Sequence, residues 1–148
     1  MLVVRNASTK DIPIILELLY ELGRPRPHVD KDIDEFSNIV KKYLLSEPTK
    51  KIILAEYDNK IVGMASMILL SRLNRKGLEL YIPELIVQKD HQSKGIGKKI
   101  MKSCIDFAKQ QKCHRIRLES GNQRTSSHQF YKKLGFEQSS LSFTKNLK

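Results

Sequence analysis

A chain of 148 residues can bury one hydrophobic core and is too short for two ordinary domains, so a single domain over residues 1–148 is expected. Apolar residues make up 40% of it, and no apolar run approaches the roughly 20 residues of a membrane span. The formal net charge of +11 invites a nucleic-acid interpretation, but a polyanionic cofactor accounts for the lysine cluster within residues 94–102 with fewer assumptions, and the remaining charge indicates a solvated surface. Because the basic residues are spread along the chain without a basic arm, the pattern argues against nucleic acid as the partner.

The two cysteines, Cys104 and Cys113, are too few for a disulfide framework and lack the spacing of a metal site. Together with a short, charged start at Met1–Arg5, they predict reduced thiols in a cytoplasmic protein. The four histidines show no metal-ligand spacing with cysteines or acidic residues, so no metal site is expected.

The first half of the chain predicts two helices between β-rich segments. Residues 2–6 indicate a strand, and a helix capped by Ser8 or Thr9 runs to about residue 22, where Gly23 stops it. Alternating prolines in residues 24–28 exclude a helix there, and a second helix spans about residues 30–45. Two strands, residues 51–57 and 60–70, are joined by the hairpin signal Asp58-Asn59.

The second half predicts a strand over residues 80–87, a glycine-containing connector and a helix with Cys104 on its buried face. Residues 114–119 alternate as a strand does, and a helix over residues 125–134 is closed by Gly135. Residues 136–147 predict one or two final strands. The order is that of an α/β protein with a mixed sheet.

The connector Gln92–Gly97, with the sequence QSKGIG, has the properties of a diphosphate cradle. The first turn of a helix presents free N–H groups and partial positive charge, and Lys94, Lys98 and Lys99 add full charges. The nucleotide-hydrolase loop is excluded because Gln92 stands where its first glycine is needed. The dinucleotide fingerprint is excluded because Ile100 stands at its third glycine.

The pattern Gln/Arg-x-x-Gly-x-Gly directly after an apolar strand resembles the coenzyme A loop of the GCN5-related N-acetyltransferase (GNAT) family. A second segment, residues 130–136 with the sequence FYKKLGF, is similar to the segment that follows this loop in the same family. The resemblance implies a GNAT-like acyl-CoA N-acyltransferase fold with a central, mostly antiparallel sheet and about four flanking helices. It also implies acetyl-CoA as cofactor, a primary amine of a small molecule or peptide as acceptor, and a homodimer as one form of assembly.

The family resemblance further implies which residues bind the cofactor. Its backbone contacts are Leu85, Ile86, Val87, Gln92, Ser93, Lys94, Gly95, Ile96, Gly97 and Lys98. The family often has an asparagine seven residues before the tyrosine, where this chain has Arg124, and Asn122 is displaced from that position by two. Asn122 and Arg124 are therefore both candidates, and Arg124 suits a cofactor phosphate or an anionic group of the substrate.

Two residues are implied as catalytic. An ammonium with a pKa near 10.4 must lose a proton before it attacks, and Glu84, in the central strand, is the candidate base. Because a carboxyl group ordinarily has a pKa near 4.3, a water relay is expected. Tyr131 matches the family's general acid, and His128, three residues earlier, is an alternative base or a surface residue.

The acceptor side of the family lies at the first two helices and their connection, which places Arg24, Arg26 and His28 near the substrate. This basic loop favours an acceptor with an anion beside its amine, such as an amino acid or an aminophosphonate. Two other functions remain open: a non-catalytic coenzyme A-binding domain and a basic nucleic-acid-binding domain. The presence of both Glu84 and Tyr131 argues against the first.

Overall fold

The computed structural model describes residues 1–121 and 124–148, and its internal contacts divide the chain into two compact units, Met1–Arg117 and Leu118–Lys148. The larger unit contains β1 (Leu2–Asn6), α1 (Ile12–Leu22), α2 (Asp30–Leu44), β2 (Lys50–Tyr57), β3 (Lys60–Ser71), β4 (Leu78–Ile82), β5 (Leu85–Val87) and α3 (Ile96–Gln110). Strand β6 (Arg115–Leu118) ends at the boundary, and the smaller unit holds α4 (Thr125–Lys133). None of the described helices is long and apolar enough to span a membrane.

The predicted elements of the first half are confirmed, and their ends have local causes. Helix α1 stops at Gly23, whose φ of 112° is left-handed and whose N–H donates to the carbonyl groups of Leu19 and Tyr20. Helix α2 begins at Asp30. The turn between β2 and β3 has φ values of 50° at Asp58 and 68° at Asn59, as expected for a tight hairpin.

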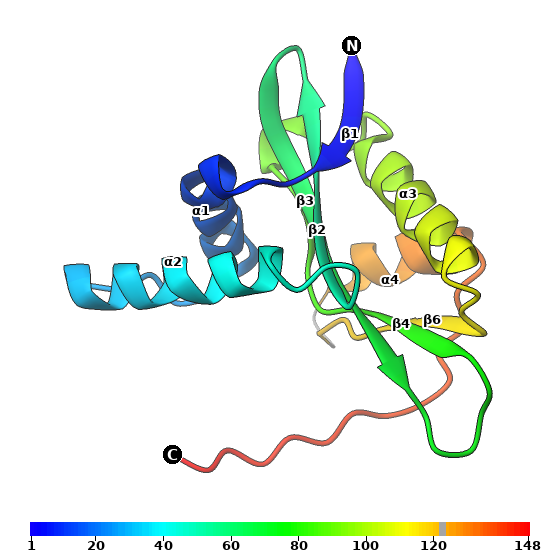
Figure 1. Ribbon diagram of the computed structural model, residues 1–148. Coiled ribbons are helices and arrows are strands. Elements are labelled where there is room, and N and C mark those ends of the chain that lie inside the picture. The colour runs from blue at the N-terminus through cyan, green and yellow to red at the C-terminus, as the bar shows by residue number, and fades with distance from the viewer. Residues whose placement is uncertain (122–123) are drawn as a thin grey trace. The chain divides into compact units, whose positions relative to one another are not determined.

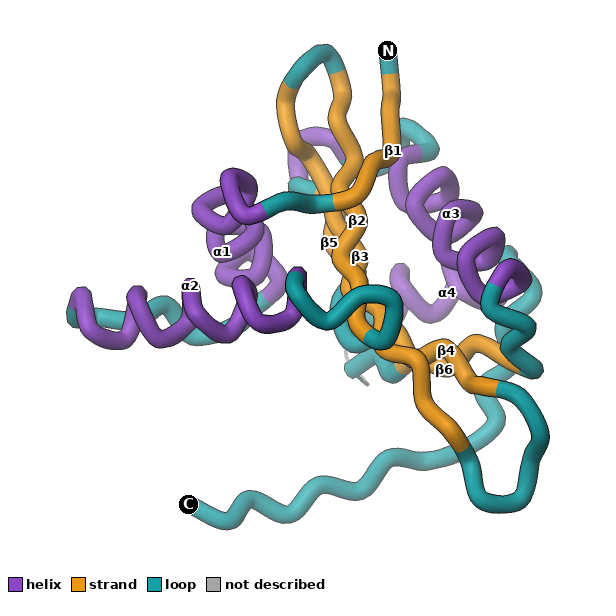
Figure 2. The backbone as a smooth tube through the Cα atoms, in the orientation of Figure 1, coloured by secondary structure: helices purple, strands orange, loops and turns teal. Residues whose placement is uncertain are grey.

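The central sheet of the larger unit has the order β1-β2-β3-β4-β6, and β5 pairs with β3 beside this path. Each pairing from β1 to β5 is antiparallel. Helices α1 and α2 cover one face and α3 covers the other, as Figure 1 and Figure 2 show. Ile15 of α1 packs in one core cluster with Leu54 of β2 and Met64 of β3. Ile100 and Cys104 are fully buried residues of α3, as the pattern of that helix predicted for Cys104.

The predicted strand over residues 80–87 is divided into β4 and β5, and the family resemblance implies a bulged strand at this place. Pro83 has no N–H to donate to a neighbouring strand, and the sheet is interrupted there. Both strands pair with β3. Leu80 of β4 faces Leu69 of β3, whereas Leu85 of β5 faces Ala65 of β3, so the register of the pairing slips by one residue between β4 and β5. The interruption is a β-bulge that holds one extra residue.

The predicted final strands over residues 136–147 are wrong. The segment after α4 contains no strand, and its apolar side chains Leu141, Phe143 and Leu147 are exposed. A strand is stable only when it pairs with a neighbour, and the described part of this segment shows no such pairing. Helix α4 does end as predicted, with Gly135 at a φ of 91°.

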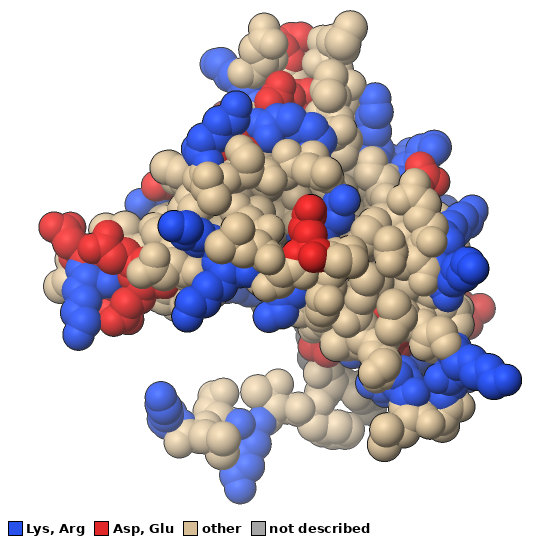
Figure 3. All heavy atoms as spheres, viewed as in Figure 1, with Lys and Arg blue, Asp and Glu red and all other residues tan. Residues whose placement is uncertain are grey.

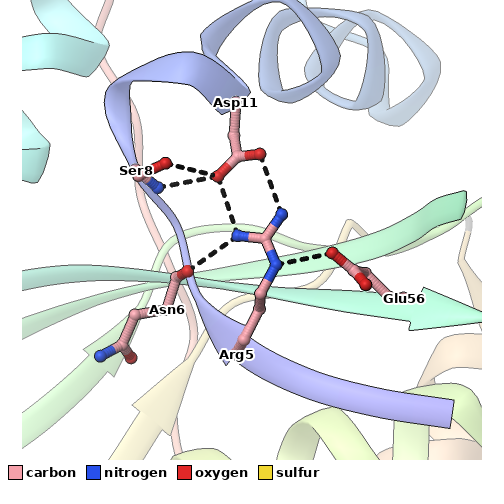
Figure 4. A network of polar contacts seen from close by, with 5 residues as sticks. All are labelled: Arg5, Asn6, Ser8, Asp11 and Glu56. Atoms are coloured by element: carbon pink, nitrogen blue, oxygen red, sulfur yellow. Dashed lines mark hydrogen bonds and ion pairs between the residues drawn. The ribbon is translucent and has the colours of Figure 1, made fainter. Parts of the chain in front are cut away.

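A network of ion pairs ties β1 to the start of α1 (Figure 4). The Arg5 guanidinium donates to both carboxylate oxygens of Asp11, at 2.9 and 3.0 Å, and to Glu56 at 2.6 Å. The Ser8 N–H also donates to Asp11, at 2.8 Å. The hydrogen bonds from Arg5 lower the pKa of the nearly buried Asp11 carboxyl from 3.8 to about 2. The network therefore fixes the direction in which α1 leaves the sheet.

Candidate functional site

The connector between β5 and α3 has the geometry of an anion cradle. The Gln92 side chain donates from Nε2 to the carbonyl of Val87 at 3.0 Å, which holds the connector against the end of β5. Ser93 and Gly95 have positive φ values of 64° and 78°, and α3 starts at Ile96, which is 1% exposed. The buried Ile96 anchors the first turn of a 15-residue helix, whose leading N–H groups lack helical partners.

The space in front of this connector suits a bulky anion. A Cβ atom added at Gly95 would meet nothing within 4 Å, so the backbone is open to a ligand. Lys94 and Lys98 are exposed, and the Lys94 ammonium lies 5.1 Å from the ring centre of Tyr57. Lys99 does not add to the cradle, because its Nζ donates to the carbonyl of Leu2 at 3.0 Å.

The strand that leads to the connector has one edge available. In the described part of the chain, β5 pairs with β3 through Gly63–Ala65 and with no other strand, whereas β4 continues the sheet to β6. A single strand edge presents N–H and C=O groups that can pair with an extended ligand. Leu85, Ile86 and Val87 therefore lie where an extended amide-containing arm can add to the sheet, and their binding role stays a prediction.

Glu84 lies at the bulge, directly before β5. Its N–H donates to the Ser66 Oγ at 3.0 Å, and the Ser66 hydroxyl donates to Glu84 Oε1 in return. The Arg24 guanidinium donates from Nη2 to Glu84 Oε2 at 2.9 Å. The Glu84 side chain is 20% exposed, and Ser66 is 2% exposed. The carboxylate is thus fixed by a buried hydroxyl on one side and held by a half-exposed cation on the other.

The bulge decides which face of the sheet Glu84 occupies. Cross-strand partners share a face, and successive residues of one strand alternate. Leu70 faces Glu79 before the bulge, and Met64 faces Ile86 after it, so Glu79 and Ile86 share a face. Glu84, two residues before Ile86, shares that face too, which α1 and α2 cover. Without the extra residue, alternation from Glu79 would turn Glu84 toward α3.

A cavity of about 320 Å³ opens beside Glu84, between α1, α2, the residues after α1 and strands β2 and β3. Its walls are mostly aliphatic and aromatic side chains, among them Leu16, Leu19, Phe36, Ile39, Tyr43 and Met64. The charged groups that line it are Arg24 and Glu84. A concave apolar pocket with a few convergent polar groups is the usual form of a small-molecule site.

Of the three residues of the predicted basic loop, one lines the cavity and two do not. Arg24 lines the cavity and binds Glu84. Arg26 binds the Glu17 carboxylate at 2.8 and 3.2 Å and lies over the Tyr20 ring at 4.4 Å. His28 is exposed and is not among the residues that line the cavity. Both guanidinium groups thus already bind carboxylates, and the substrate role of all three residues stays a prediction.

Another acidic residue of this sheet, Glu79 in β4, has a different environment. It is 0% exposed and contacts three arginines, Arg115, Arg117 at 3.3 Å and Arg72 at 3.9 Å. Burial opposes ionisation of the Glu79 carboxyl, but hydrogen bonds from Arg115 and Arg117 outweigh it and hold its pKa below the ordinary value. Glu79 therefore joins β4 to β6 and has no access to a ligand.

The smaller unit carries the predicted acid. Tyr131, on α4, packs edge-to-face with Phe130 at 5.3 Å and with Phe136 at 5.9 Å between ring centres. His128 lies on the same helix with its Nε2 2.9 Å from the Gly121 carbonyl oxygen. Arg124 caps the start of α4 and is exposed. Asn122 lies outside the described residues, and the roles of Tyr131 and Arg124 stay predictions.

Two contributors near Glu84 were missed in the sequence. Ser66 is a buried hydroxyl in the otherwise apolar β3, and this polar interruption of a core strand was a usable signal. Tyr43 lines the cavity and donates from its hydroxyl to the Met67 carbonyl at 3.3 Å. Burial raises the Tyr43 pKa well above its ordinary value, so this phenol stays protonated. No spacing in the sequence indicates its position.

The charged side chains are mixed over the visible face of the molecule. Figure 3 shows acidic groups gathered at one end of α2 and Lys and Arg at several separate places.

The two cysteines are free, and burial raises the pKa of the Cys104 thiol to about 12. Burial also raises the pKa of Cys113. Neither sulfur therefore has the thiolate character of a nucleophile.

Comparison with known proteins gives consistent matches. The model of the Acetyltransferase (GNAT) family matches residues 15–136. Human N-acetyltransferase 8 is 31% identical over 111 residues, which cover 74% of this chain and 48% of that protein. The aminoalkylphosphonate N-acetyltransferase of Salmonella typhimurium is 27% identical over 144 residues, or 97% of this chain and 90% of that protein. The chain spans about half the length of several curated relatives it matches.

Among solved structures, a transcriptional regulator from Bacillus halodurans has a TM-score of 0.89 at 24% identity, covering 99% of this chain and 100% of that one. This likeness concerns the fold. With the family match, it confirms the predicted α/β class with a central sheet flanked by helices.

Proposed function

Because the chain belongs to the acetyltransferase (GNAT) family, we propose that it transfers the acetyl group of acetyl-CoA to a primary amine of a small molecule or peptide. The transfer is direct, from thioester to amine. The burial of Cys104 supports this route, because a thiol that is 0% exposed and whose pKa is raised by burial is a poor nucleophile toward a thioester.

One observation carries the proposal: β5 joins the candidate base to the anion cradle. Glu84 stands directly before this strand, and the cradle of residues 92–98 follows it. Three residues of extended chain span about 10 Å, which suits an arm that binds along the strand with its phosphates at the cradle. The acetyl end of that arm then lies on the Glu84 side, beside the cavity.

The Glu84 carboxylate serves as the base, with a water molecule relaying the proton. The bound ammonium first gives one proton, through the water molecule, to Glu84, which releases it to solvent. The neutral nitrogen then attacks the carbonyl carbon, a C–N bond forms, and the C–S bond breaks. The second proton leaving nitrogen passes to Glu84, and the Tyr131 hydroxyl donates a proton to the departing thiolate, so the products are an amide and a thiol. Proton exchange through solvent then restores Glu84 and Tyr131, with one proton released overall. Ser66 is a positioning residue, because it fixes one oxygen of Glu84 and its N–H.

The acceptor can be described further from the residues around Glu84. The basic loop Arg24, Arg26 and His28 favours an amine with a nearby anion, and the name of the aminoalkylphosphonate N-acetyltransferase relative supports this choice. The ion pairs of Arg24 with Glu84 and of Arg26 with Glu17 weigh against it, since an anionic substrate must compete with both carboxylates.

The proposal is tested by melting the protein with and without millimolar acetyl-CoA, and then by measuring thiol release with a panel of primary amines. A ligand at about a hundred times its dissociation constant adds roughly 2.7 kcal/mol, so a rise of several degrees is expected. Thiol release that depends on the amine completes the assignment. A melting temperature insensitive to acetyl-CoA at low and high salt would refute it. A rise without thiol release would instead indicate a non-catalytic coenzyme A-binding domain.

A further inference from the structure

The cavity beside Glu84 is much more apolar than a site for a small charged acceptor needs to be. Its walls come from four elements and bring aliphatic and aromatic side chains to one carboxylate. At about 320 Å³, it lies at the low end of the volumes typical of small-molecule sites. An acceptor that fills it contributes an apolar body and one cation.

The Arg24 guanidinium supplies that cation in the protein alone. It binds Oε2 of Glu84 at 2.9 Å, while Oε1 is held by Ser66. The backbone of Arg24 is fixed, because its N–H donates to the Leu19 carbonyl at the end of α1. The side chain is 50% exposed and can leave Glu84 for solvent without moving the helix.

We infer that the acceptor is a primary amine with an apolar body, and that its ammonium group displaces Arg24 from Glu84 Oε2. The inference rests on the proposed function and specifies its substrate. The apolar body lies against Leu19, Phe36 and Ile39, and the nitrogen lies next to Glu84, which accepts its proton through the relaying water molecule. Arg24 is therefore an internal competitor of the substrate, not a receptor for a substrate anion.

The rest of the basic loop agrees with this assignment. Arg26 binds Glu17 and lies over the outer rim residue Tyr20, so its charge is directed along α1 and not to Glu84. An acceptor carboxylate or phosphonate placed in the cavity would meet apolar walls and the Glu84 charge. Burying an anion there is unfavourable unless Arg24 leaves Glu84 to pair with it.

The first experiment measures binding without acetyl transfer, using calorimetry on the full chain saturated with coenzyme A. The probes are 2-phenylethylamine, phenylalanine, ethanolamine and 2-aminoethylphosphonate. Burying an aromatic side chain supports at least a tenfold tighter binding of 2-phenylethylamine than of ethanolamine. Tighter binding of phenylalanine or of the phosphonate than of 2-phenylethylamine overturns the inference.

Substitutions separate the two roles of Arg24. Arg24→Gln removes the competing cation from Glu84 and is therefore expected to tighten the binding of 2-phenylethylamine. Because a half-exposed ion pair contributes little free energy, the expected gain in affinity is about three- to fivefold. If Arg24 instead binds an anionic group of the substrate, the same substitution weakens the binding of the two anionic probes and leaves the affinity for 2-phenylethylamine unchanged. Arg75→Gln, an equal change of charge in the exposed turn before β4, controls for the general electrostatic effect and is expected to change no affinity.

A second variant tests the apolar wall. Ile39 is 59% exposed and lines the cavity, so the neutral polar substitution Ile39→Asn keeps the core intact and adds no charge. It is expected to weaken the binding of 2-phenylethylamine at least fivefold and to leave the binding of ethanolamine unchanged. Equal effects on both amines would overturn the inference. Because these are binding measurements, selective binding of apolar amines without thiol release would refute the proposed reaction alone, whereas thiol release confined to anionic amines would refute the inference alone.

Discussion

Two glutamates five residues apart, Glu79 and Glu84, lie on the same face of one sheet but differ in burial and in the number of their cationic partners. Glu79 is fully buried among three arginines, and each side of its carboxylate is paired. Glu84 is partly exposed, has one arginine and one buried hydroxyl as partners, and faces an apolar cavity. The number of cations and the access to a cavity separate a structural carboxylate from a candidate base.

The difference has an energetic basis. Three guanidinium groups offset the cost of burying the Glu79 charge, and Arg115 and Arg117 each donate a hydrogen bond to one of its oxygens. At Glu84, the neutral hydroxyl of Ser66 fixes the group without neutralising it, and the single half-exposed cation is replaceable. The comparison therefore predicts that one glutamate determines activity and the other determines stability.

The largest expected effect is that of Glu84→Gln on catalysis. A positioned general base commonly contributes 10²- to 10⁴-fold, so kcat is expected to fall by about that factor at pH 7. The amide retains the shape of the side chain, and the melting temperature should stay within about 2 °C of the parent. Steady-state thiol release and a melting curve check both statements. A variant with normal kcat would remove the distinction between the two carboxylates.

Glu79→Gln should have the converse result. It leaves three arginines around a neutral group, and breaking such a buried cluster costs about 3 kcal/mol of unfolding free energy. Denaturant unfolding measures this loss, while kcat at a temperature well below the transition should stay within about twofold. A large fall in kcat with unchanged stability would show that Glu79 belongs to the chemistry.

Asp11 extends the comparison to a third carboxylate, which is nearly buried and paired with one arginine. Its pKa is lowered from 3.8 to about 2, which corresponds to about 2 kcal/mol. This stabilisation is complete above about pH 4 and is lost as the pH falls through about 2, because protonation ends the pairing with Arg5. Unfolding measured from pH 5 to pH 2 checks it against Asp11→Asn, whose acid dependence in that range should be flatter.

The smallest effect is expected for Ser66→Ala. The substitution removes the hydroxyl that fixes Glu84, so kcat should fall about tenfold through poorer positioning. Ser66→Thr, which keeps the hydroxyl, is expected to restore kcat toward the parent value even if packing lowers stability. Steady-state thiol release measures kcat, and an unchanged kcat in Ser66→Ala would reduce Ser66 to a core residue.

Much of the larger unit was predictable because its signals are local. The hairpin at Asp58-Asn59, the stop of α1 at Gly23 and the cradle between β5 and α3 depend on residues close together in the sequence. A turn residue with positive φ and a helix start carry their structural reason with them. The position of Glu84 at the start of the strand that leads to the cradle followed from a family resemblance, and its catalytic role stays a prediction.

The remaining features depend on long-range contacts that no local pattern encodes. Arg24 pairs with Glu84, which is 60 residues away in the sequence, and Arg26 pairs with Glu17 of α1. Both positive charges of the predicted basic loop are therefore paired with carboxylates. The final strands failed because alternation of Leu141 and Phe143 does not supply a partner strand. Ser66 was visible as a polar interruption, but its contact with Glu84 required the sheet register.

The bulge between Ile82 and Leu85 has a consequence for how such proteins change by insertion and deletion. The extra residue sets the phase of β5 relative to β4, and the phase decides which side of the sheet carries Glu84. Deleting one residue there would leave the cradle and α3 intact while directing the glutamate away from the cavity. A chain altered in this way would keep its candidate ligand-binding loop and lose its proposed base, so under the proposed function the length of one short segment separates an enzyme from a binding protein.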